Sequence, residues 1–263
     1  MQSKILAVTI DVESDAACFG DPRITSLQGV KEGLPGYIDF FLHREIPVTL
    51  FIVAEVVNSV DIKKDAEMIE VASHGYYHTY PPKYMLELSF NDLKREVLGS
   101  KIILEKVLKT HIYGFRAHAF QINAPILNFV AKYYSYDSSI ALNKKYGKQK
   151  ASIHLPYNPD PYNIVSHGTM PLVELPRTTI KTPIMSIPLN GSYIRFLPCF
   201  ILLKILRKFD FILINFHAQD LILPRHKQFM YLNKLTRIFK FLLKNEYLPL
   251  KCNDIVKRYK TLS

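Results

Sequence analysis

Short apolar runs that end in polar residues recur along the chain and alternate with longer amphipathic stretches. The first run covers residues 5–10, and further runs typical of buried strands cover residues 47–53, 69–72, 112–115, 173–175 and 211–216, with a strand end at 133–137. Helical spacing of apolar positions predicts helices over residues 30–44, 89–108, 125–132 and 223–245. This alternation predicts an α/β domain with a largely parallel sheet or barrel. Residues 143–170, rich in Pro, Asn, Tyr and Gly, are expected to form loops.

Length and composition indicate one folded domain over residues 1–263. The chain is 48% hydrophobic and 22% charged, and it contains no internal repeat or linker. A chain of this size buries about three quarters of its unfolded surface, so it needs no disulfides to fold. Its three cysteines, Cys18, Cys199 and Cys252, form no CxxC pair, which excludes a disulfide framework or a zinc knuckle. No apolar run is long enough for an export signal or a membrane span, so a cytoplasmic location is expected.

Positive charge is concentrated at the end of the chain. From Gly191 onward there are 14 Lys and Arg against 4 Asp and Glu, whereas the first 190 residues have 20 against 19. Such asymmetry points to an anionic partner, which would be a membrane surface, a phosphorylated substrate or nucleic acid. An ordinary solvated lysine-rich helix face explains it equally well. No recognised nucleic-acid motif accompanies the basic region, so nucleic acid is not expected as a partner.

Polar residues with catalytic chemistry follow several of the predicted strands. In parallel α/β folds the carboxyl ends of the strands converge on one face, where active sites form. The residues at these ends are Asp11, Glu13, His74, His78, Arg116, Asp137 and His217. Two histidines four residues apart and one carboxylate can make the His–His–carboxylate set of an open catalytic metal site. Each residue alone is a weak signal, but together they predict an active site at this edge.

In these motifs the sequence resembles the polysaccharide deacetylases of the NodB-homology type, the fourth carbohydrate-esterase family. The resemblance rests on Thr9-Ile10-Asp11-Val12-Glu13, Ser73-His74-Gly75-Tyr76-Tyr77-His78, Gly114-Phe115-Arg116-Ala117-His118, Tyr136-Asp137-Ser138-Ser139 and Asn215-Phe216-His217-Ala218. It is strongest over residues 4–221 and leaves basic C-terminal helices at 222–263. It implies a single-domain distorted (β/α) barrel with about seven strands. It also implies metal-dependent hydrolysis of acyl groups on sugars.

The resemblance also implies roles for the first three motifs. Asp11 would be the general base and Glu13 a metal ligand, in the family's variant with spaced carboxylates. His74 and His78 would complete the ligands of one divalent metal, for which zinc is expected. Arg116 would hold Asp11 in place.

The last two motifs supply the remaining catalytic groups. His217 would be the general acid that protonates the departing amine, and Asp137 is the candidate from the looser fourth motif. A backbone N–H near Ala119 or Phe120 would help to bind the oxyanion.

Three positions depart from the family pattern. Glu13 replaces the usual Asp ligand, His118 stands where the family has Pro, and Asn215 stands where it has an apolar Leu. None of these changes removes a chemical group that the reaction requires. The remaining histidines match no family position and are expected on the surface or in loops.

The resemblance thus implies a hydrolase that removes an acetyl or formyl group from the nitrogen of an aminosugar. The substrate would be a lipid-phosphate-linked sugar or another glycan precursor. Two alternatives stay open: a related amidohydrolase acting on a small amide or ureide, and a non-catalytic sugar-binding domain. The apolar run at 196–206 and the basic helix at 223–245 predict peripheral association with an anionic membrane, at its inner face. The alternative for residues 196–206 is a buried core helix.

Overall fold

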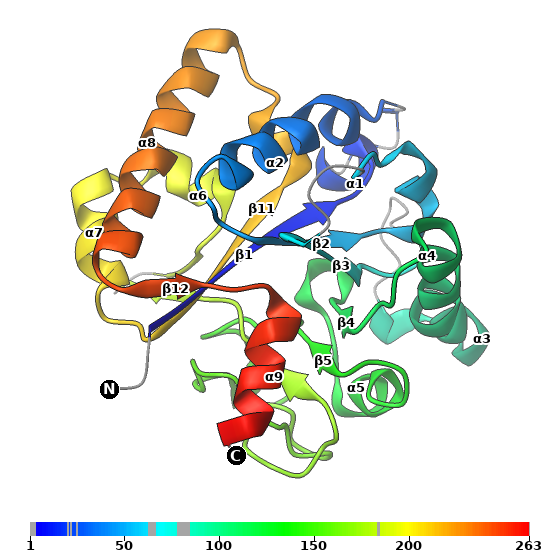
Figure 1. The fold of residues 1–263 in the computed structure, drawn as a ribbon. Coiled ribbons are helices and arrows are strands. Elements are labelled where there is room, and N and C mark those ends of the chain that lie inside the picture. Colours follow the sequence, from blue (N-terminus) through cyan, green and yellow to red (C-terminus); the bar gives the residue numbers. More distant parts are fainter. Residues whose placement is uncertain are drawn as a thin grey trace.

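The structure, a computed structural model, describes residues 4–19, 21, 23–24, 26–62, 67–77, 85–182 and 185–262. One parallel sheet runs through the molecule in the order β11-β1-β2-β3-β4-β5-β8, with β12 paired to the first residues of β1 (Figure 1). Its strands are β1 (Lys4–Val12), β2 (Val48–Ile52), β3 (Ile69–Ser73), β4 (Gly114–Phe115), β5 (Tyr136–Asp137), β8 (Val173–Glu174), β11 (Phe211–His217) and β12 (Tyr247–Pro249). Two small hairpins, β6–β7 (Lys145–Tyr146, Gln149–Lys150) and β9–β10 (Thr179–Lys181, Ser186–Pro188), lie outside this sheet.

Helices connect the strands and cover the outer face of the sheet (Figure 1). The α-helices are α1 (Asp15–Phe19), α2 (Leu34–Leu42), α3 (Phe90–Lys94), α4 (Ser100–Leu108), α5 (Ala124–Val130), α6 (Gly191–Phe196), α7 (Cys199–Leu206), α8 (Arg225–Lys244) and α9 (Cys252–Leu262). Shorter helical turns are η1 (Gly29–Gly33), η2 (Ala54–Ser59), η3 (Met85–Glu87), η4 (Arg95–Gly99), η5 (His118–Phe120) and η6 (Ala218–Leu221). Among the described residues, no helix is both long and apolar enough to cross a membrane.

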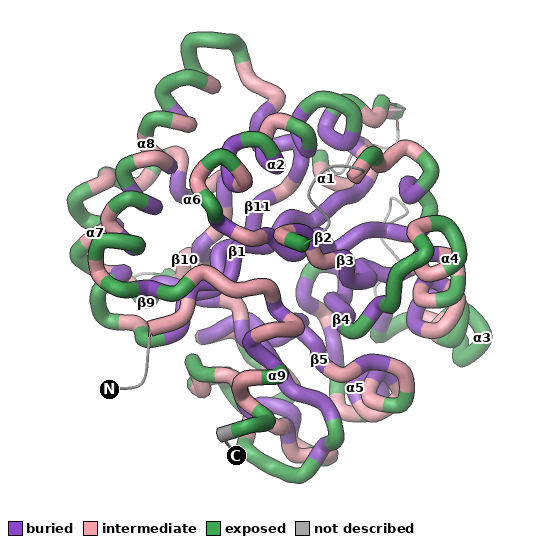
Figure 2. The backbone as a smooth tube through the Cα atoms, in the orientation of Figure 1, coloured by how far each residue is buried: buried purple, intermediate pink, exposed green. Residues whose placement is uncertain are grey.

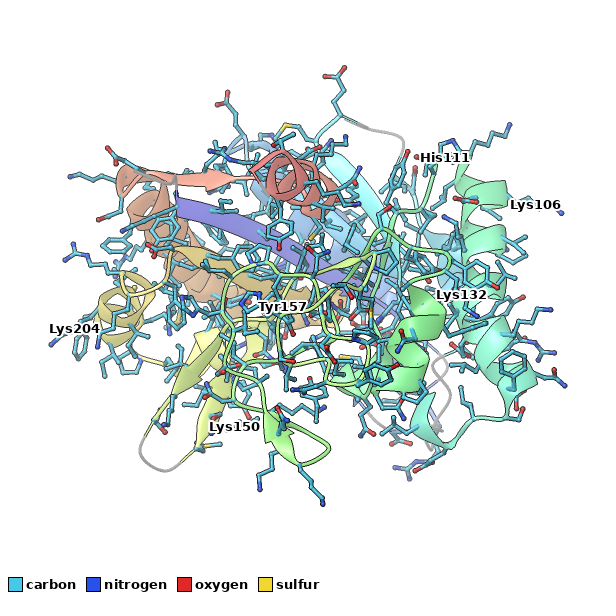
Figure 3. The ribbon with its side chains drawn as sticks, turned by 90° about the horizontal axis from the view of Figure 1, so that it is seen from below. Lys106, His111, Lys132, Lys150, Tyr157 and Lys204 are labelled. Carbon is cyan, nitrogen blue, oxygen red and sulfur yellow. The ribbon has the colours of Figure 1, made fainter. Side chains whose placement is uncertain are left out.

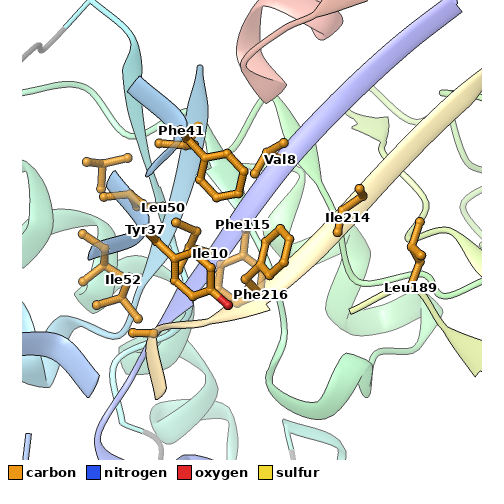
Figure 4. Packing of buried hydrophobic residues seen from close by; sticks show 14 of the residues in the cluster. Val8, Ile10, Tyr37, Phe41, Leu50, Ile52, Phe115, Leu189, Ile214 and Phe216 are labelled. Carbon is orange, nitrogen blue, oxygen red and sulfur yellow. The ribbon is translucent and has the colours of Figure 1, made fainter. Parts of the chain in front are cut away.

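Alternation of side chains along the strands separates the outer core from the barrel interior. Val8, Ile10 and Phe216 point outward and pack with Tyr37 and Phe41 of α2 (Figure 4). The outer core continues between α2 and α8, because the ring of Phe41 also meets Phe239 edge-on at 5.1 Å. The intervening residues of the same strands face inward, and successive positions along β1 therefore serve different layers.

The interior of the barrel changes from apolar to polar along the strand direction. The part nearer the amino-terminal ends of the strands is an apolar cluster, to which Ala7, Phe51, Ala72, Tyr136 and Leu213 contribute. Further along β1 and β11, the inward positions are occupied by polar residues, namely Thr9, Asp11, Asn215 and His217. The carboxyl ends of the strands therefore carry the polar and ionisable side chains of the barrel interior.

The barrel closes between β8 and β11 through a connecting segment rather than a continuous ladder. The backbone N–H of Leu213 donates to Thr178 Oγ1 at 2.9 Å, and the N–H of Leu189 donates to the Thr178 carbonyl at 3.0 Å. The N–H of Asn215 in turn donates to the Leu189 carbonyl at 3.1 Å. This irregular closure confirms the distorted (β/α) barrel that the sequence predicted.

The C-terminal helix α9 lies within residues 222–263, where basic C-terminal helices were expected without individual bounds, and it closes the amino-terminal end of the barrel. Its residues Cys252, Ile255 and Val256 join the apolar interior cluster. The first N–H groups of the helix are bound by barrel side chains, with Cys252 N donating to Thr49 Oγ1 at 3.0 Å. Figure 2 shows both α9 and α8 with buried inner faces and exposed outer faces.

Other expectations hold in outline but not in their boundaries. The helix expected over residues 89–108 consists of α3, the π-helical turn η4 and α4. The strand expected at residues 112–115 is only two residues long, as β4. The region expected to be loops contains the β6–β7 hairpin.

Candidate active site

Asp11 lies near the carboxyl end of β1 and points into the barrel. Its Oδ1 accepts a hydrogen bond from Arg116 Nη1 at 2.6 Å, and its Oδ2 accepts one from Asn215 Nδ2 at 2.9 Å. Burial alone would raise the pKa of this carboxyl group, but the positive charge of Arg116, with smaller contributions from His74 and His217, holds the pKa well below its usual value. Asp11 is therefore an ionised carboxylate in a buried position.

Arg116 is a fully buried cation, and each of its three guanidinium nitrogens donates to an acceptor. Besides Asp11, Nη1 reaches Asn215 Oδ1 at 2.7 Å, and Nε and Nη2 donate to the carbonyl and hydroxyl oxygens of Ser138. The guanidinium carbon lies 3.8 Å from the centre of the Phe51 ring, on top of the apolar interior. The cation is thus held rigidly and can orient Asp11.

His74, immediately after β3, faces the same carboxylate. Its Nδ1 lies 2.8 Å from the carbonyl oxygen of Arg116, so Nδ1 carries the proton and Nε2 carries the lone pair. Nε2 is 3.8 Å from Asp11 Oδ2. Burial lowers the pKa of His74 to about 3, which makes the ring neutral near pH 7. A neutral, oriented imidazole beside a carboxylate is suited to bind a cation.

His217, at the end of β11, lies across from these groups. Its Nε2 is 3.9 Å from both Asp11 Oδ2 and Glu13 Oε1, and its side chain is 26% exposed. Burial opposes protonation, but the negative charges of Glu13, Asp11 and Asp220 outweigh it and raise the pKa of His217. The ring can therefore hold a proton at the open side of the site.

Glu13 is held beside His217 in a buried position. Burial raises the pKa of its carboxyl group to about 7, with His217 acting against the rise and Asp11 adding to it. Its backbone carbonyl accepts a hydrogen bond from Gln219 Nε2 at 2.8 Å, which ties the segment after β1 to η6. Two carboxylates and two histidines thus meet at this end of the barrel.

The imidazole and carboxylate groups of this site are chemical types that bind divalent cations. Catalytic metals are bound by neutral imidazoles and carboxylates, and a ligating His commonly donates its other N–H to a backbone carbonyl, as His74 does. Within the described part of the chain, no group of three or more His, Cys, Asp or Glu side chains is arranged to hold a metal ion. His78 lies outside the described residues, so the expected set of Glu13, His74 and His78 stays a prediction.

Solved structures with the same overall fold include deacetylases, an allantoinase and a pseudoenzyme. A protein named as a polysaccharide deacetylase from Mycobacterium smegmatis matches with a TM-score of 0.68 and 16% identity, over 100% of this chain and 92% of that protein. The chain has the polysaccharide deacetylase fold. The allantoinase PuuE matches with a TM-score of 0.67 and 16% identity, over 99% of this chain and 91% of that one. A carbohydrate esterase family 4 pseudoenzyme from Bacillus anthracis matches with a TM-score of 0.58 and 11% identity, over 97% and 66%.

These matches confirm the resemblance at the level of the polysaccharide deacetylase fold. No protein-family model matches the sequence, and no curated protein does. One fold that carries a deacetylase, an allantoinase and a pseudoenzyme does not by itself determine chemistry. The argument for activity therefore has to come from the residues of the site.

Asp137 lies deeper in the deacetylase fold than His217. Its two carboxylate oxygens accept hydrogen bonds from the backbone N–H and the hydroxyl of Ser139, both at 2.8 Å. It faces the buried Glu174, and burial raises the pKa of both carboxyl groups, so that the pair holds a proton between them. Ser139 in turn accepts a hydrogen bond from the N–H of Ala117, next to Arg116. Asp137 thus supports the Arg116 segment, whereas the carboxylates near His217 are those of Asp11, Glu13 and Asp220.

Asn215 and Asp220 are site residues whose roles the sequence analysis did not predict. Asn215 bridges Arg116 and Asp11, with its oxygen accepting from one and its nitrogen donating to the other. Asp220 Oδ2 accepts from the backbone N–H of His217 at 2.9 Å and lies 3.9 Å from His217 Nδ1. The sequence contained a signal for the role of Asn215, because this residue is a lone amide at an inward position of an otherwise apolar strand. Asp220 follows His217 by three residues in a helical turn, which is a weak signal.

A buried carboxylate, Glu96, fixes the segment after His74. Its oxygens accept hydrogen bonds from the N–H of Tyr76 at 2.7 Å and of Tyr77 at 3.1 Å. His118 Nε2 is 3.5 Å from Glu96 Oε2, and the His118 ring packs on the His74 ring with centroids 4.7 Å apart. Gly75 has φ +83°, and a Cβ there would lie 2.5 Å from both Glu96 Oε2 and His118 Nε2. This segment therefore requires glycine at position 75.

Proposed function

We propose that the protein is a metal-dependent hydrolase that removes an N-linked acyl group, acetyl or formyl, from an aminosugar. The observation that carries the proposal is the geometry at Asp11. A buried carboxylate held ionised by Arg116 lies 3.9 Å from the ring of His217, which has a raised pKa. An ionised base and a protonated acid side by side are the two groups that amide hydrolysis needs.

One divalent metal, with zinc expected, would be held by Glu13, His74 and His78. Such an ion supplies Lewis acidity toward the acyl oxygen and toward water. Neutral His74, anchored through Nδ1, and the buried carboxylate of Glu13 support this assignment.

The residues of the chain supply the proton transfers. Asp11 Oδ2, which lies 3.8 Å from His74 Nε2 and 3.9 Å from His217 Nε2, would accept the proton of the attacking water. His217 Nε2 would give its proton to the departing nitrogen, because an amine anion is too poor a leaving group. Asp220 fixes the His217 backbone and stabilises the protonated ring. The N–H of Phe120 donates to Ala117, which leaves the N–H of Ala119 as the proposed oxyanion donor.

The function is tested by adding zinc, cobalt or manganese to the purified protein. Free, nucleotide-linked and lipid-linked N-acetyl and N-formyl aminosugars are then screened for released acetate or formate. The expected result is metal-dependent release from at least one aminosugar. A screen in which only allantoin or another ureide is hydrolysed would favour the amidohydrolase alternative, for which the PuuE match is the specific support.

His217→Ala is expected to lower kcat on the confirmed substrate by about 100-fold or more, because the leaving nitrogen loses its proton donor. The metal content should stay within error of the wild type. His111→Ala is the matched control, since His111 is an exposed histidine outside the site. A His217→Ala variant with near wild-type turnover would show that another group is the acid.

The proposal extends to the membrane, because α6 and α7 carry an exposed aromatic surface. The side chains of Phe196 and Phe200, on α6 and α7, are 80% and 74% exposed, whereas Leu202 and Leu206 of α7 are buried. The segment is therefore not wholly a core helix. Helix α6 is fixed to the site, since Ser192 Oγ donates to Asp220 Oδ1 at 2.9 Å.

Basic residues rim this aromatic surface. Lys204, Arg207 and Lys208 are exposed at the end of α7 and beyond it, and Lys204 projects from the surface in Figure 3. Aromatic side chains surrounded by cations suit the interface of an anionic bilayer, to which each nearby basic residue contributes about 1 kcal/mol. These features support a substrate that is presented at a membrane, such as a lipid-phosphate-linked aminosugar.

Vesicle sedimentation tests the membrane surface. The protein is expected to sediment with vesicles of phosphatidylcholine and phosphatidylglycerol at low salt, much less at high salt, and not with pure phosphatidylcholine. Phe196→Ser combined with Phe200→Ser should abolish this binding. Tyr162→Ser, which removes an aromatic side chain that is 92% exposed elsewhere, should leave it intact. Absence of binding at low salt would rule out the membrane surface.

A further inference from the structure

Arg177 carries a cation that the described residues do not neutralise. It follows β8, and its backbone is held by the parallel bridge to Ala141. No carboxylate within the described part of the chain forms an ion pair with Arg177, and its buried Nε has no hydrogen-bond partner there. Arg116 and Arg195, by contrast, are paired with Asp11 and Asp220.

The guanidinium group of Arg177 stacks on Phe120, whose ring also lies near Arg116 of the candidate site. Its carbon is 3.6 Å from the centre of the Phe120 ring, and the same ring is 5.4 Å from the guanidinium carbon of Arg116. The next residue in the chain is Thr178. Its Oγ1 accepts a hydrogen bond from the backbone N–H of Leu213 on β11, four residues before His217. Arg177 therefore lies between the η5 loop and the strand that carries the proposed general acid.

Electrostatic effects agree with this placement. Burial, with the neighbouring charge of Arg116, lowers the pKa of Arg177 to about 10, while Asp11 acts in the opposite direction. The charge of Arg177 is also felt at His217, where it opposes protonation. Arg177 thus lies within electrostatic range of Asp11 and His217.

A second cation, Lys144, reaches the same loop. Its Nζ donates to the carbonyl oxygens of Ala119 at 2.9 Å and Phe120 at 2.6 Å. Burial and the charge of Arg177 lower the pKa of Lys144 to about 8. Ala119 and Phe120 have φ of 51° and 55°, so Lys144 helps to hold an unfavourable loop conformation. Three cations surround Phe120, and only Arg116 has a carboxylate partner among the described residues.

Positive charge that is partly removed from water is costly unless an anion is near. We propose that Arg177, supported by Lys144, forms an anion subsite that binds a phosphate or carboxylate group of the substrate next to the scissile amide. The inference rests on the proposed function and narrows its substrate class to acylated aminosugars that carry an anionic group. The planar fork of Arg177 matches both phosphate and carboxylate oxygens, and its stacking on Phe120 fixes its orientation.

The test compares the affinity of the metal-loaded protein for three sugars by titration calorimetry and ligand-observed NMR. N-acetylglucosamine 1-phosphate carries a phosphate, N-acetylmuramic acid carries a carboxylate, and N-acetylglucosamine is neutral. The wild type is expected to bind at least one charged sugar about 10- to 100-fold more tightly than the neutral sugar, as a charge-assisted hydrogen bond predicts. The preferred sugar distinguishes phosphate from carboxylate.

Two variants assign this preference to Arg177. Arg177→Gln should bind the charged and neutral sugars equally, whereas Arg177→Lys should retain part of the preference. Arg237→Gln, which removes an exposed cation of α8, should behave as the wild type. The Tm of Arg177→Gln should be unchanged or higher, because an unneutralised cation is removed.

Three results would overturn the subsite. They are equal affinity of the wild type for all three sugars, no binding of any of them, and an unchanged preference in Arg177→Gln. A lower Tm of Arg177→Gln with an unchanged preference would show that Arg177 only packs on Phe120. Since affinity is measured without turnover, a charge preference that persists when no sugar is deacylated would refute the proposed reaction and leave the subsite standing.

Discussion

Asp11→Asn is expected to reduce kcat on the confirmed substrate toward the upper end of the range of about 10²- to 10⁴-fold that general acid–base catalysis contributes. The amide retains the size of the side chain and can accept a hydrogen bond from Arg116, but it cannot take a proton from water. It also removes the negative charge that favours protonated His217. Base and acid are therefore both weakened by one substitution.

Turnover and metal content should be measured on the same Asp11→Asn preparation. The metal content should change much less than kcat if Asp11 is the base and Glu13, His74 and His78 are the ligands. Asp39→Asn, an exposed position on α2, is the matched control and should leave both values unchanged. If Asp11→Asn keeps near wild-type turnover, Asp11 is not the base. If it loses the metal in proportion to activity, Asp11 is a ligand.

Arg116→Met is expected to lower the free energy of unfolding by about 3–5 kcal/mol, the usual effect of removing one partner of a buried ion pair. The side chain is fully buried, and its loss would leave Asp11 charged without its cation. It would also remove a donor from Asn215 and two donors from Ser138. Urea unfolding followed by circular dichroism measures the change, with Arg237→Met as an exposed control.

The double variant Arg116→Met with Asp11→Leu separates the ion pair from the other contacts of Arg116. It should be more stable than Arg116→Met alone, because no unpaired charge then remains in the barrel. A single Arg116→Met variant that unfolds at the wild-type urea concentration would show that the pair does not stabilise the fold. The ion pair would then serve only to orient Asp11.

The sequence alone predicted the layers of the fold because each layer depends on local periodicity. Apolar runs such as residues 5–10 and 211–216 correspond to β1 and β11, and the spacing over residues 223–245 corresponds to α8. Boundaries were less accurate where tertiary contacts replace local preference. Strands β4 and β5 are two residues long, because pairing in the sheet rather than composition determines their ends. Helix α9 falls within residues 222–263, where helices were expected without individual bounds, and the helical spacing of Cys252, Ile255 and Val256 suits a helix that packs on one end of the barrel.

The sequence also predicted which residues meet, because the carboxyl ends of neighbouring parallel strands lie together. One end of the barrel carries Asp11, Glu13, His74, Arg116 and His217. Arg116 forms an ion pair with Asp11, and His217 Nε2 lies 3.9 Å from the carboxylates of Asp11 and Glu13. Only the tertiary structure decided the partners of these groups. Asn215 bridges Arg116 and Asp11, Asp220 binds the backbone N–H of His217, and Arg177 stacks on Phe120 without a carboxylate partner among the described residues. These partnerships depend on packing between segments far apart in the chain, for which spacing along a strand or helix contains no signal.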